Sequence, residues 1–274
     1  MEIKNHLLFD ANGKQVPFKA TPNKGGIYVP QYLVIHYTAA TTAASAINWF
    51  LNPVAQASAH LVIAQDGTIT QFAPFNVVTW HAGKSEWKGV SGLNQFSIGI
   101  ELVNGGRLRQ SGDKWTCPVD RCVVPNDEVM LATHKNETDQ CAWHEYDGRQ
   151  MEVAALVAAT LVQAYGLKDV LGHEDISPIR KSDPGPAFPM GSFRSRAMGR
   201  NDETTDEYIT SAELNIRSGP GTTFSTLTTP PMPPATPVLV LKTEGTWSFV
   251  DVQATVNSVM DLEGWVASKF LVKK

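Results

Sequence analysis

Two side chains that commonly bind metal ions lie ten residues apart in the stretch "GHEDISPIRKSDPGPAF", from Gly172 to Phe188. His173 offers an imidazole and Asp183 a carboxylate, and the prolines stiffen the segment that carries them. A catalytic zinc site needs three protein ligands and an open position, and two imidazoles with a carboxylate are a common set. The same two residues could also be a capping histidine and a solvated loop aspartate. The choice depends on whether the chain supplies a third ligand and a base.

A candidate third ligand ends the apolar run "QYLVIHYTAA". The β-branched residues of this run predict a buried strand from about Tyr32 to Tyr37. His36 lies at the end of that strand, and a strand is a rigid element on which a ligand can be held. A lone histidine at a strand end is more often a hydrogen-bonded structural residue. His36 alone is therefore weak evidence for a metal site.

A candidate general base lies in "FSIGIELVNGG", which predicts another strand from about Ser97 to Val103. Because side chains alternate along a strand, Gly99 and Glu101 share the face opposite Ile98 and Ile100. An acidic side chain on an apolar strand is costly to bury unless it is paired or functional. The absent side chain of Gly99 lets another group approach the sheet closely. The alternative is an edge strand from which Glu101 faces solvent.

The other elements alternate in a way that predicts a mixed α/β sheet flanked by helices. They are a short helix in "TTAASAINWFLNP" capped by Thr41 or Thr42, a hairpin at Asp66-Gly67, a long helix from about Arg149 to Tyr165 and a short strand at 169–171. These elements must position the candidate ligands.

The segment from Gly105 to His144 has no sustained hydrophobic period and is expected to be an inserted loop. It holds the three cysteines, Cys117, Cys122 and Cys141. An odd, clustered set does not resemble a secreted disulfide scaffold, so we expect reduced thiols. Together with His134 and His144 they could bind a structural zinc ion, but their spacings match no common zinc finger.

Composition narrows the classes of partner. Hydrophobic residues make up 42% of the chain, charged residues 18%, and the formal net charge is −4. The chain can therefore bury a core, and the lack of a basic run argues against nucleic acid as the main partner. No apolar stretch reaches the roughly 18 residues of a membrane span. The N-terminal stretch lacks the pattern of a secretory signal.

The character of the sequence changes after Pro189. "SFRSRAMGRNDETTDEY" is polar and charged, as in a linker. Short strand-like runs separated by Gly and Pro follow, and they predict a small all-β barrel. We expect a catalytic domain over 1–194 with an N-terminal arm and the inserted loop 105–144, a linker over 195–207 and the barrel over 208–274.

Three separated motifs, "LVIHYTA", "TWHAGKSEWKG…LNQFSIGIEL" and "GHEDISPIRKSDPGPAF", carry a family resemblance. Together they resemble the zinc-dependent N-acetylmuramoyl-L-alanine amidases of the type 2 amidase and peptidoglycan recognition protein superfamily. The resemblance runs from about Tyr32 to Phe188 and covers the inserted loop poorly. It implies a Zn²⁺ ion held by His36, His173 and Asp183, with Glu101 as general base and Lys181 as stabiliser of the oxyanion.

The residue types agree with these implied roles. Zinc lowers the pKa of a bound water molecule to about 7, a carboxylate can take the proton of that water, and a cation can stabilise the developing charge. The resemblance implies a peptidoglycan hydrolase that cleaves the amide between N-acetylmuramic acid and the L-alanine of the stem peptide. The alternatives are a non-catalytic peptidoglycan receptor and a zinc peptidase that cuts within the stem peptide.

In similar enzymes the segment "TWHAG" lines the substrate groove. The resemblance therefore implies that Trp80, His81 and Asn94 bind substrate, although Trp80 could instead be a core residue. Some relatives have a catalytic tyrosine where this chain has Ala59, which leaves the role of base to Glu101. The next residue, His60, is interpreted as structural and oriented by a hydrogen bond.

The runs "LNIRSGPGTTFSTL", "GTWSFVDV" and "EGWVASKFL" resemble bacterial Src-homology-3-like domains over about Thr210 to Val272, apart from the proline-rich "TTPPMPPATP". Such a module would tether the chain to its polymer. We expect peptidoglycan or muropeptides as partners, reached at the cell wall without a signal peptide or met as fragments in the cytoplasm. The residues set no oligomeric state.

Overall fold

The computed structural model describes residues 1–199, 207–257, 259 and 262–273. The chain divides into two compact units, Met1–Phe188 and Pro189–Lys274. Residues 200–206 of the expected linker lie outside the described residues. In the described part of the chain, no helix is long and apolar enough to cross a membrane.

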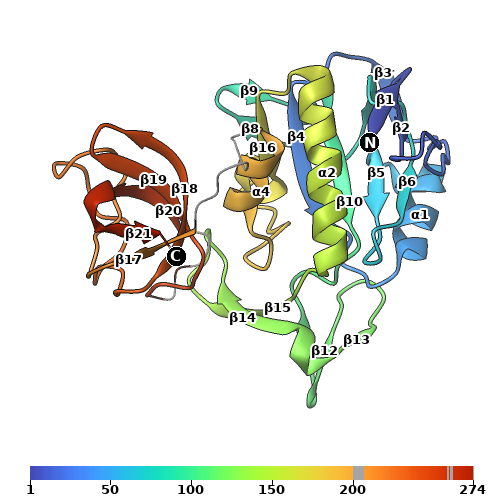
Figure 1. Cartoon of the computed structure of the whole chain (residues 1–274). Helices are drawn as coiled ribbons and strands as arrows, with labels where there is room; N and C mark the ends of the chain where they lie inside the picture. Colours follow the sequence, from blue (N-terminus) through green and yellow to red (C-terminus); the bar gives the residue numbers. More distant parts are fainter. Residues whose placement is uncertain (200–206, 258, 260–261, 274) are drawn as a thin grey trace. The chain divides into compact units, whose positions relative to one another are not determined.

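A five-stranded sheet forms the centre of the first unit (Figure 1). Its strand order is β16 (Asp169–Gly172), β4 (Tyr32–Tyr37), β10 (Ser97–Leu102), β5 (Leu61–Ile63) and β6 (Ile69–Gln71). The first four strands are parallel to one another, and β6 runs antiparallel to β5. Because β10 lies between β4 and β5, the interpretation of Glu101 as an edge-strand residue is wrong. With its helices, the sheet confirms the expected mixed α/β fold.

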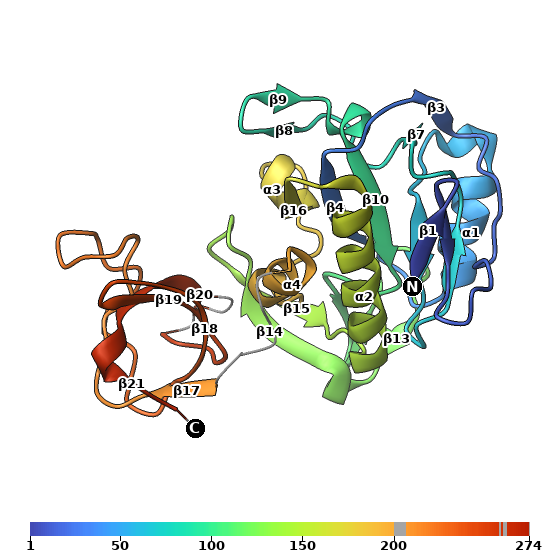
Figure 2. The same ribbon diagram turned by 45° about the horizontal axis from the view of Figure 1, so that its top comes forward.

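Helix α2 (Gly148–Tyr165) lies along β4 and β10, as Figures 1 and 2 show. It begins where the Asp147 carboxylate accepts hydrogen bonds from two backbone N–H groups, and it ends at Gly166, which adopts the left-handed conformation. The buried Gln150 fastens it to the sheet, because its Nε2 donates to the carbonyl oxygens of Ile63 and Val103.

Helix α1 (Ala43–Leu51) packs beside β5 through Ala46 and Phe50. Thr42 occupies the N-cap position, but its side chain makes no capping hydrogen bond. The neighbouring Thr41 donates from its backbone N–H and its hydroxyl to the carboxylate of Asp120, which lies in the segment 105–144. That long-range bond replaces the local cap expected from the sequence.

The N-terminal arm contains regular structure. Its strands are β1 (Glu2–Lys4), β2 (Leu7–Phe9) and β3 (Lys24–Ile27). The other strands before β10 that lie outside the central sheet are β7 (Val77–Thr79), β8 (Glu86–Trp87) and β9 (Val90–Ser91). They form three two-stranded pairs, β1 with β2, β3 with β7 and β8 with β9. The arm is anchored by Leu8, which is fully buried and whose N–H donates to the side chain of Gln71.

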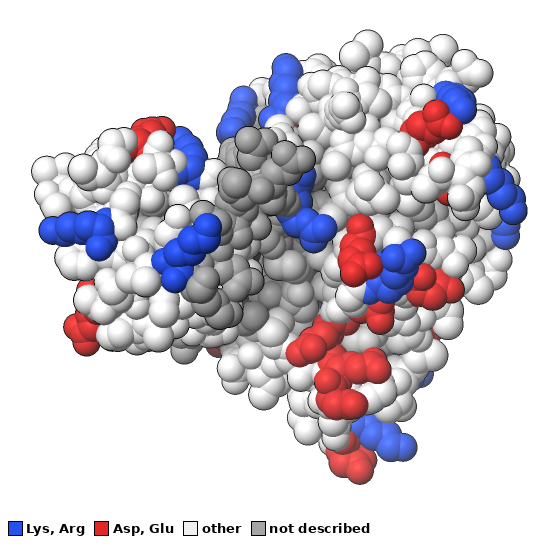
Figure 3. Space-filling view, in the orientation of Figure 1, with Lys and Arg blue, Asp and Glu red and all other residues white. Residues whose placement is uncertain are grey.

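The segment 105–144 is not an irregular loop, and the expectation from its sequence is wrong. Its strands are β11 (Arg109–Ser111), β12 (Lys114–Thr116), β13 (Val123–Val124), β14 (Val129–Thr133) and β15 (Gln140–His144). They form a three-stranded sheet and a separate β14–β15 hairpin. Strands of two to five residues are too short to show a clear alternation, so the pattern missed them. Asp and Glu side chains gather over this part of the unit, in the lower part of Figure 3.

The second unit begins with α4 (Met190–Ala197), so residues 195–197 are helical and not linker as expected. Its five strands are β17 (Glu207–Thr210), β18 (Pro237–Glu244), β19 (Trp247–Val252), β20 (Leu262–Ala267) and β21 (Leu271–Lys273). They form an antiparallel sheet in the order β20-β19-β18-β17-β21. Ile216, Val250 and Val266 lie in its core. The closure of this sheet into a barrel stays a prediction.

Candidate metal centre

Three neighbouring parallel strands bring the candidate residues to one edge of the sheet. Glu101 on β10 is the register partner of His36 on β4. On the other side of β4, Gly172 of β16 is the partner of Ile35, so His173 follows at the level of His36. The carboxyl ends of parallel strands are where open α/β sheets bind ligands. The strand register therefore brings together residues that lie far apart in the sequence.

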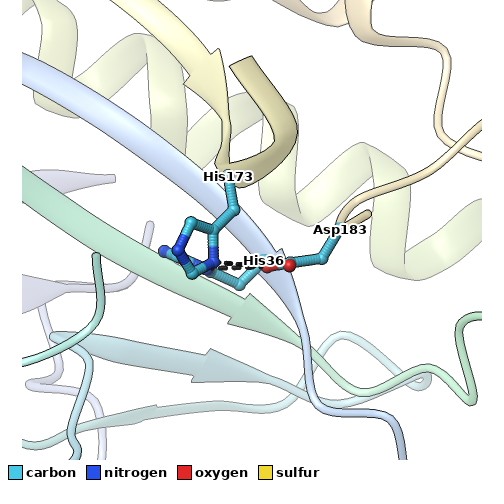
Figure 4. A group of neighbouring side chains, drawn as sticks. All are labelled: His36, His173 and Asp183. Carbon is cyan, nitrogen blue, oxygen red and sulfur yellow. Dashed lines mark hydrogen bonds and ion pairs between the residues drawn. The ribbon is translucent and has the colours of Figure 1, made fainter. Parts of the chain in front are cut away.

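His36, His173 and Asp183 point toward one another (Figure 4). The Nδ1 atoms of the two histidines lie 2.9 Å apart, and each lies 2.9 Å from Oδ2 of Asp183. All three side chains are buried. Among the described residues, this is the group of side chains that could hold a metal ion.

The protonation states of this group suit a metal site. Burial, together with repulsion from His173, lowers the pKa of His36 to about 4, so its imidazole is neutral near pH 7. Burial alone would raise the pKa of Asp183, but its contacts with His173 and His36 lower that pKa well below its usual value. Metal ligands must be unprotonated, and a set of two imidazoles with one carboxylate suits zinc.

The loop that carries Asp183 is fixed to helix α3 (His173–Ile176) by backbone hydrogen bonds. The N–H of Glu174 donates to the carbonyl oxygen of Asp183 at 2.8 Å. The N–H of Lys181 donates to the carbonyl oxygen of Ser177 at 3.0 Å. The aspartate therefore returns to a histidine ten residues earlier because the intervening chain forms a closed, hydrogen-bonded loop.

The β14–β15 hairpin contributes to the same loop, which the sequence did not indicate. Nε2 of His134 donates to Oε2 of Glu174 at 2.5 Å, and Lys135 forms an ion pair with Oε1 of Glu174 at 2.9 Å. The same Oε2 accepts from the N–H of Gly185. Trp143 packs so closely on Gly185 that a Cβ there would lie 2.6 Å from its ring. An acidic residue needs a partner once it is buried, but nothing in the sequence shows that Glu174 is buried.

Glu101 has the character of a residue held for a reaction. Its side chain is partly accessible, yet Oε2 is buried and finds no hydrogen-bond partner among the described residues. Burial and the nearby charge of Asp183 raise its pKa well above the usual value, and Lys181 opposes that shift. A buried, unpaired carboxylate oxygen costs stability, so its presence beside three candidate ligands favours a chemical role.

The positive charge of Lys181 influences the candidate metal ligands and the candidate base. It acts electrostatically on both His36 and Glu101, lowering the pKa of each. The side chain is half-buried, in the loop between His173 and Asp183. A cation there is suited to neutralise negative charge that develops near the metal ligands.

The structure surrounds the expected substrate-binding residues with protein contacts. His81 is buried, and its Nδ1 lies 3.0 Å from Nε2 of His36. Oδ1 of Asn94 accepts from the N–H groups of His81 and Ala82. Trp80 is 36% exposed, so its interpretation as a core residue is wrong. Substrate binding by these residues stays a prediction.

His60 and the cysteines lie apart from the ligand group. Nδ1 of His60 accepts from the N–H of Gly99, and its Nε2 lies 2.9 Å from the carbonyl oxygen of Val77, which fits a structural role. Cys117, Cys122 and Cys141 are free thiols.

Comparison with known proteins gives a family match over residues 27–186, more than half of the chain, to the model described as N-acetylmuramoyl-L-alanine amidase. The matched range contains all three candidate ligands, Glu101 and Lys181.

Individual relatives agree with this match. The chain is 35% identical over 139 residues to 1,6-anhydro-N-acetylmuramyl-L-alanine amidase AmpD of Escherichia coli. The aligned region covers 50% of this chain and 56% of AmpD. It is 38% identical over 162 residues to N-acetylmuramoyl-L-alanine amidase A of Achromobacter lyticus, covering 58% of this chain and 79% of that one. The chain thus spans about half the length of AmpD and most of the second relative.

The fold is also found among solved structures. A crystal structure of a selenomethionine derivative of AmpD superposes with a TM-score of 0.51 and 25% sequence identity. The alignment covers 72% of this chain and 99% of that chain.

The histidines predict how stability depends on pH. Burial lowers the pKa of His36 to about 4, that of His60 to about 3, and that of His81 well below its usual value. When the pH is lowered from 7 to 5, these histidines become protonated in the unfolded chain but stay neutral in the folded chain. The free energy of unfolding of the metal-free protein therefore decreases. For His36 and His60 the loss by pH 5 is roughly 2 kcal/mol each. Urea unfolding with a chelator at both pH values measures it.

Glu101 has the opposite effect on the pH dependence of stability from that of the buried histidines, and a variant at this position tests it. Its raised pKa lets the folded chain bind a proton above about pH 4.5, where the unfolded carboxylate is still ionised, so this residue adds stability as the pH falls. Glu101→Gln should therefore lose more stability between pH 7 and pH 5 than the unaltered protein. A stability that stays constant or rises on acidification would contradict the neutral buried imidazoles.

Proposed function

We propose, because the chain belongs to the N-acetylmuramoyl-L-alanine amidase family, that it cleaves the amide between N-acetylmuramic acid and the L-alanine of a stem peptide. The observation that carries the proposal is the convergence of two imidazole nitrogens and a carboxylate oxygen, 2.9 Å from one another, beside an unpaired buried carboxylate oxygen of Glu101. AmpD and the Achromobacter protein carry amidase names that agree with this reaction.

The ligand set fits zinc. His36 and His173 would each bind through Nδ1 and Asp183 through Oδ2, since these atoms converge. A bound zinc ion would polarise the scissile carbonyl and lower the pKa of a water molecule to about 7.

Glu101 is assigned the proton transfers. Its partly accessible side chain can accept a proton from the attacking water and return it to the leaving amine of L-alanine. Burial and the charge of Asp183 raise the pKa of this carboxyl, which makes it a stronger acceptor for the proton of the attacking water. The unpaired oxygen supports this assignment, because a new hydrogen bond forms there without breaking an existing one.

Lys181 is assigned the stabilisation of the negative charge that develops on the substrate. During attack, the carbonyl oxygen of the substrate gains negative charge, and a half-buried ammonium group stabilises it more than it stabilises the neutral carbonyl. The electrostatic effect of Lys181 on the pKa of His36 and on that of Glu101 supports this assignment.

Two alternatives are less well supported. A receptor that only binds peptidoglycan needs no base, and would have no reason to retain a destabilising carboxylate such as Glu101. A zinc peptidase could use the same ligands, but the family membership favours the amide next to the sugar.

We also propose that the second unit is a Src-homology-3-like module that binds peptidoglycan. Its five-stranded antiparallel sheet and its sequence motifs support this assignment. A second binding unit would raise the local concentration of the catalytic unit at the polymer.

The reaction is tested by mass spectrometry of the products from purified peptidoglycan and from a soluble muropeptide, with and without a chelator. We expect free stem peptides that begin with L-alanine, lost with the chelator and restored by added zinc. Fragments cut inside the peptide would identify a peptidase instead. Binding to the wall with no product from either substrate would identify a receptor.

The roles at the centre are tested by two variants with separate readouts. Glu101→Gln should lower kcat by at least about 100-fold because no group takes the proton, while zinc content stays unchanged. His173→Ala should lose zinc as well as activity, because one of three ligands is removed. Glu152→Gln, at an exposed position of α2, is the control and should behave as the unaltered protein. Full activity of Glu101→Gln would refute its role.

The role of the second unit is tested by truncation after Arg200. We expect binding to sacculi to weaken at least about tenfold, while cleavage of a small soluble muropeptide changes little. A sedimentation assay and the product assay measure the two effects. Equal losses in both assays would count against a tethering role.

A further inference from the structure

The two histidine ligands share one neighbouring segment. His81 and Ala82 follow directly after β7 and Trp80, and they lie against the outer ring nitrogens of His36 and His173. These are the Nε2 atoms, whereas the Nδ1 atoms of the two rings converge on Asp183.

The contact with His36 fixes which of its nitrogens carries hydrogen. Nε2 of His81 lies 3.2 Å from the carbonyl oxygen of Ser97. A carbonyl can only accept, so Nε2 of neutral His81 is the donor and its Nδ1 has a free lone pair. That lone pair lies 3.0 Å from Nε2 of His36, which must then be the N–H. Nδ1 of His36 is left unprotonated and directed at Asp183.

The contact with His173 has the same effect through a backbone atom. Nε2 of His173 lies 3.1 Å from the carbonyl oxygen of Ala82, which again can only accept. The hydrogen on Nε2 is thus directed at this oxygen, which leaves Nδ1, the nitrogen next to Asp183, as the atom that can bind a metal ion. Nη2 of Arg180 donates to the same carbonyl oxygen at 3.0 Å and helps to hold it in place.

Asn94 and Gly99 fix the position of this segment. Oδ1 of Asn94 accepts from the N–H of His81 at 3.0 Å and from the N–H of Ala82 at 2.7 Å. Gly99 makes room for the imidazole, because a Cβ at this position would lie 2.5 Å from the His81 ring. The approach expected next to Gly99 is thus made by His81.

We propose that the His81–Ala82 segment, anchored by Asn94, is a positioning element that sets the tautomer and orientation of both histidine ligands. This inference rests on the proposed metal site and deepens it. His81 and Asn94 act through His36 and His173, in place of the substrate contact that the family resemblance implied. Hydrogen-bond partners of ligand histidines usually change metal affinity or activity by about 10- to 100-fold when they are removed.

The experiment measures the zinc dissociation constant by competition with a chromophoric chelator, without substrate. His81→Phe keeps a ring but removes the acceptor for His36, and we expect zinc to bind about 10- to 100-fold more weakly. Asn94→Ala releases both backbone N–H groups and should weaken zinc in the same direction. His81→Asn restores an acceptor close to the position of Nδ1 and should recover part of the affinity.

A second readout separates positioning from a general loss of packing. The visible absorption spectrum of the cobalt-substituted protein reports ligand geometry, and it should change in His81→Phe. His144→Phe is the matched control, because His144 is a buried imidazole that contacts none of the ligands. It should keep the zinc affinity and the cobalt spectrum of the unaltered protein.

The outcomes distinguish the inference from the function on which it rests. If the unaltered protein binds no zinc, the proposed function and the inference both fail. If it binds zinc and His81→Phe and Asn94→Ala bind equally tightly but show a raised KM, the residues contact substrate and the inference alone is refuted. Should His81→Phe fail to fold, Asn94→Ala and His81→Asn decide by the same criteria.

Discussion

The metal centre depends on one constraint, which is that two buried imidazoles must present unprotonated nitrogens to a buried carboxylate. Burial disfavours the charged form of an imidazole and lowers the pKa of His36, so this ring is neutral near pH 7. A neutral imidazole has one donor and one acceptor nitrogen, and the protein must choose which of them faces the carboxylate. The sheet supplies the positions, and hydrogen bonds on the far side of each ring supply the choice.

The same constraint explains the elements around the centre. Asp183 reaches the histidines only if its loop is closed, and Glu174 links that loop to His134 and Lys135 of the β14–β15 hairpin. The segment 105–144, which lies between the sequence motifs of the family, therefore supports the loop that carries His173 and Asp183. Glu101 is the exception to the satisfied contacts around it, since its buried Oε2 has no partner among the described residues. Proteins tend to accept such a cost where chemistry occurs.

Sequence patterns predicted the parts of the structure that have long or repeated signals. The central strands, the hairpin at Asp66-Gly67 and helix α2 follow from periodicity, turn residues and caps within one segment. The strands of 105–144 and helix α4 were missed, because two to five residues show little alternation and α4 has few apolar residues. The partners of Thr41 and Glu174 were also missed, because each bond joins residues at least 40 positions apart.

The sequence by itself determined the candidate chemistry: two histidines, an aspartate, a glutamate and a lysine at strand ends and in a proline-stiffened loop, in the motif order of an amidase. Only the tertiary structure decided which nitrogen of each histidine faces the aspartate and what holds it there. His81 could be assigned to a groove from its motif, yet its ring lies against His36 over Gly99. Residue type and spacing specify which donors a chain offers. Their direction depends on strand register and on backbone carbonyls far away in sequence, and that information exists only once the chain has folded.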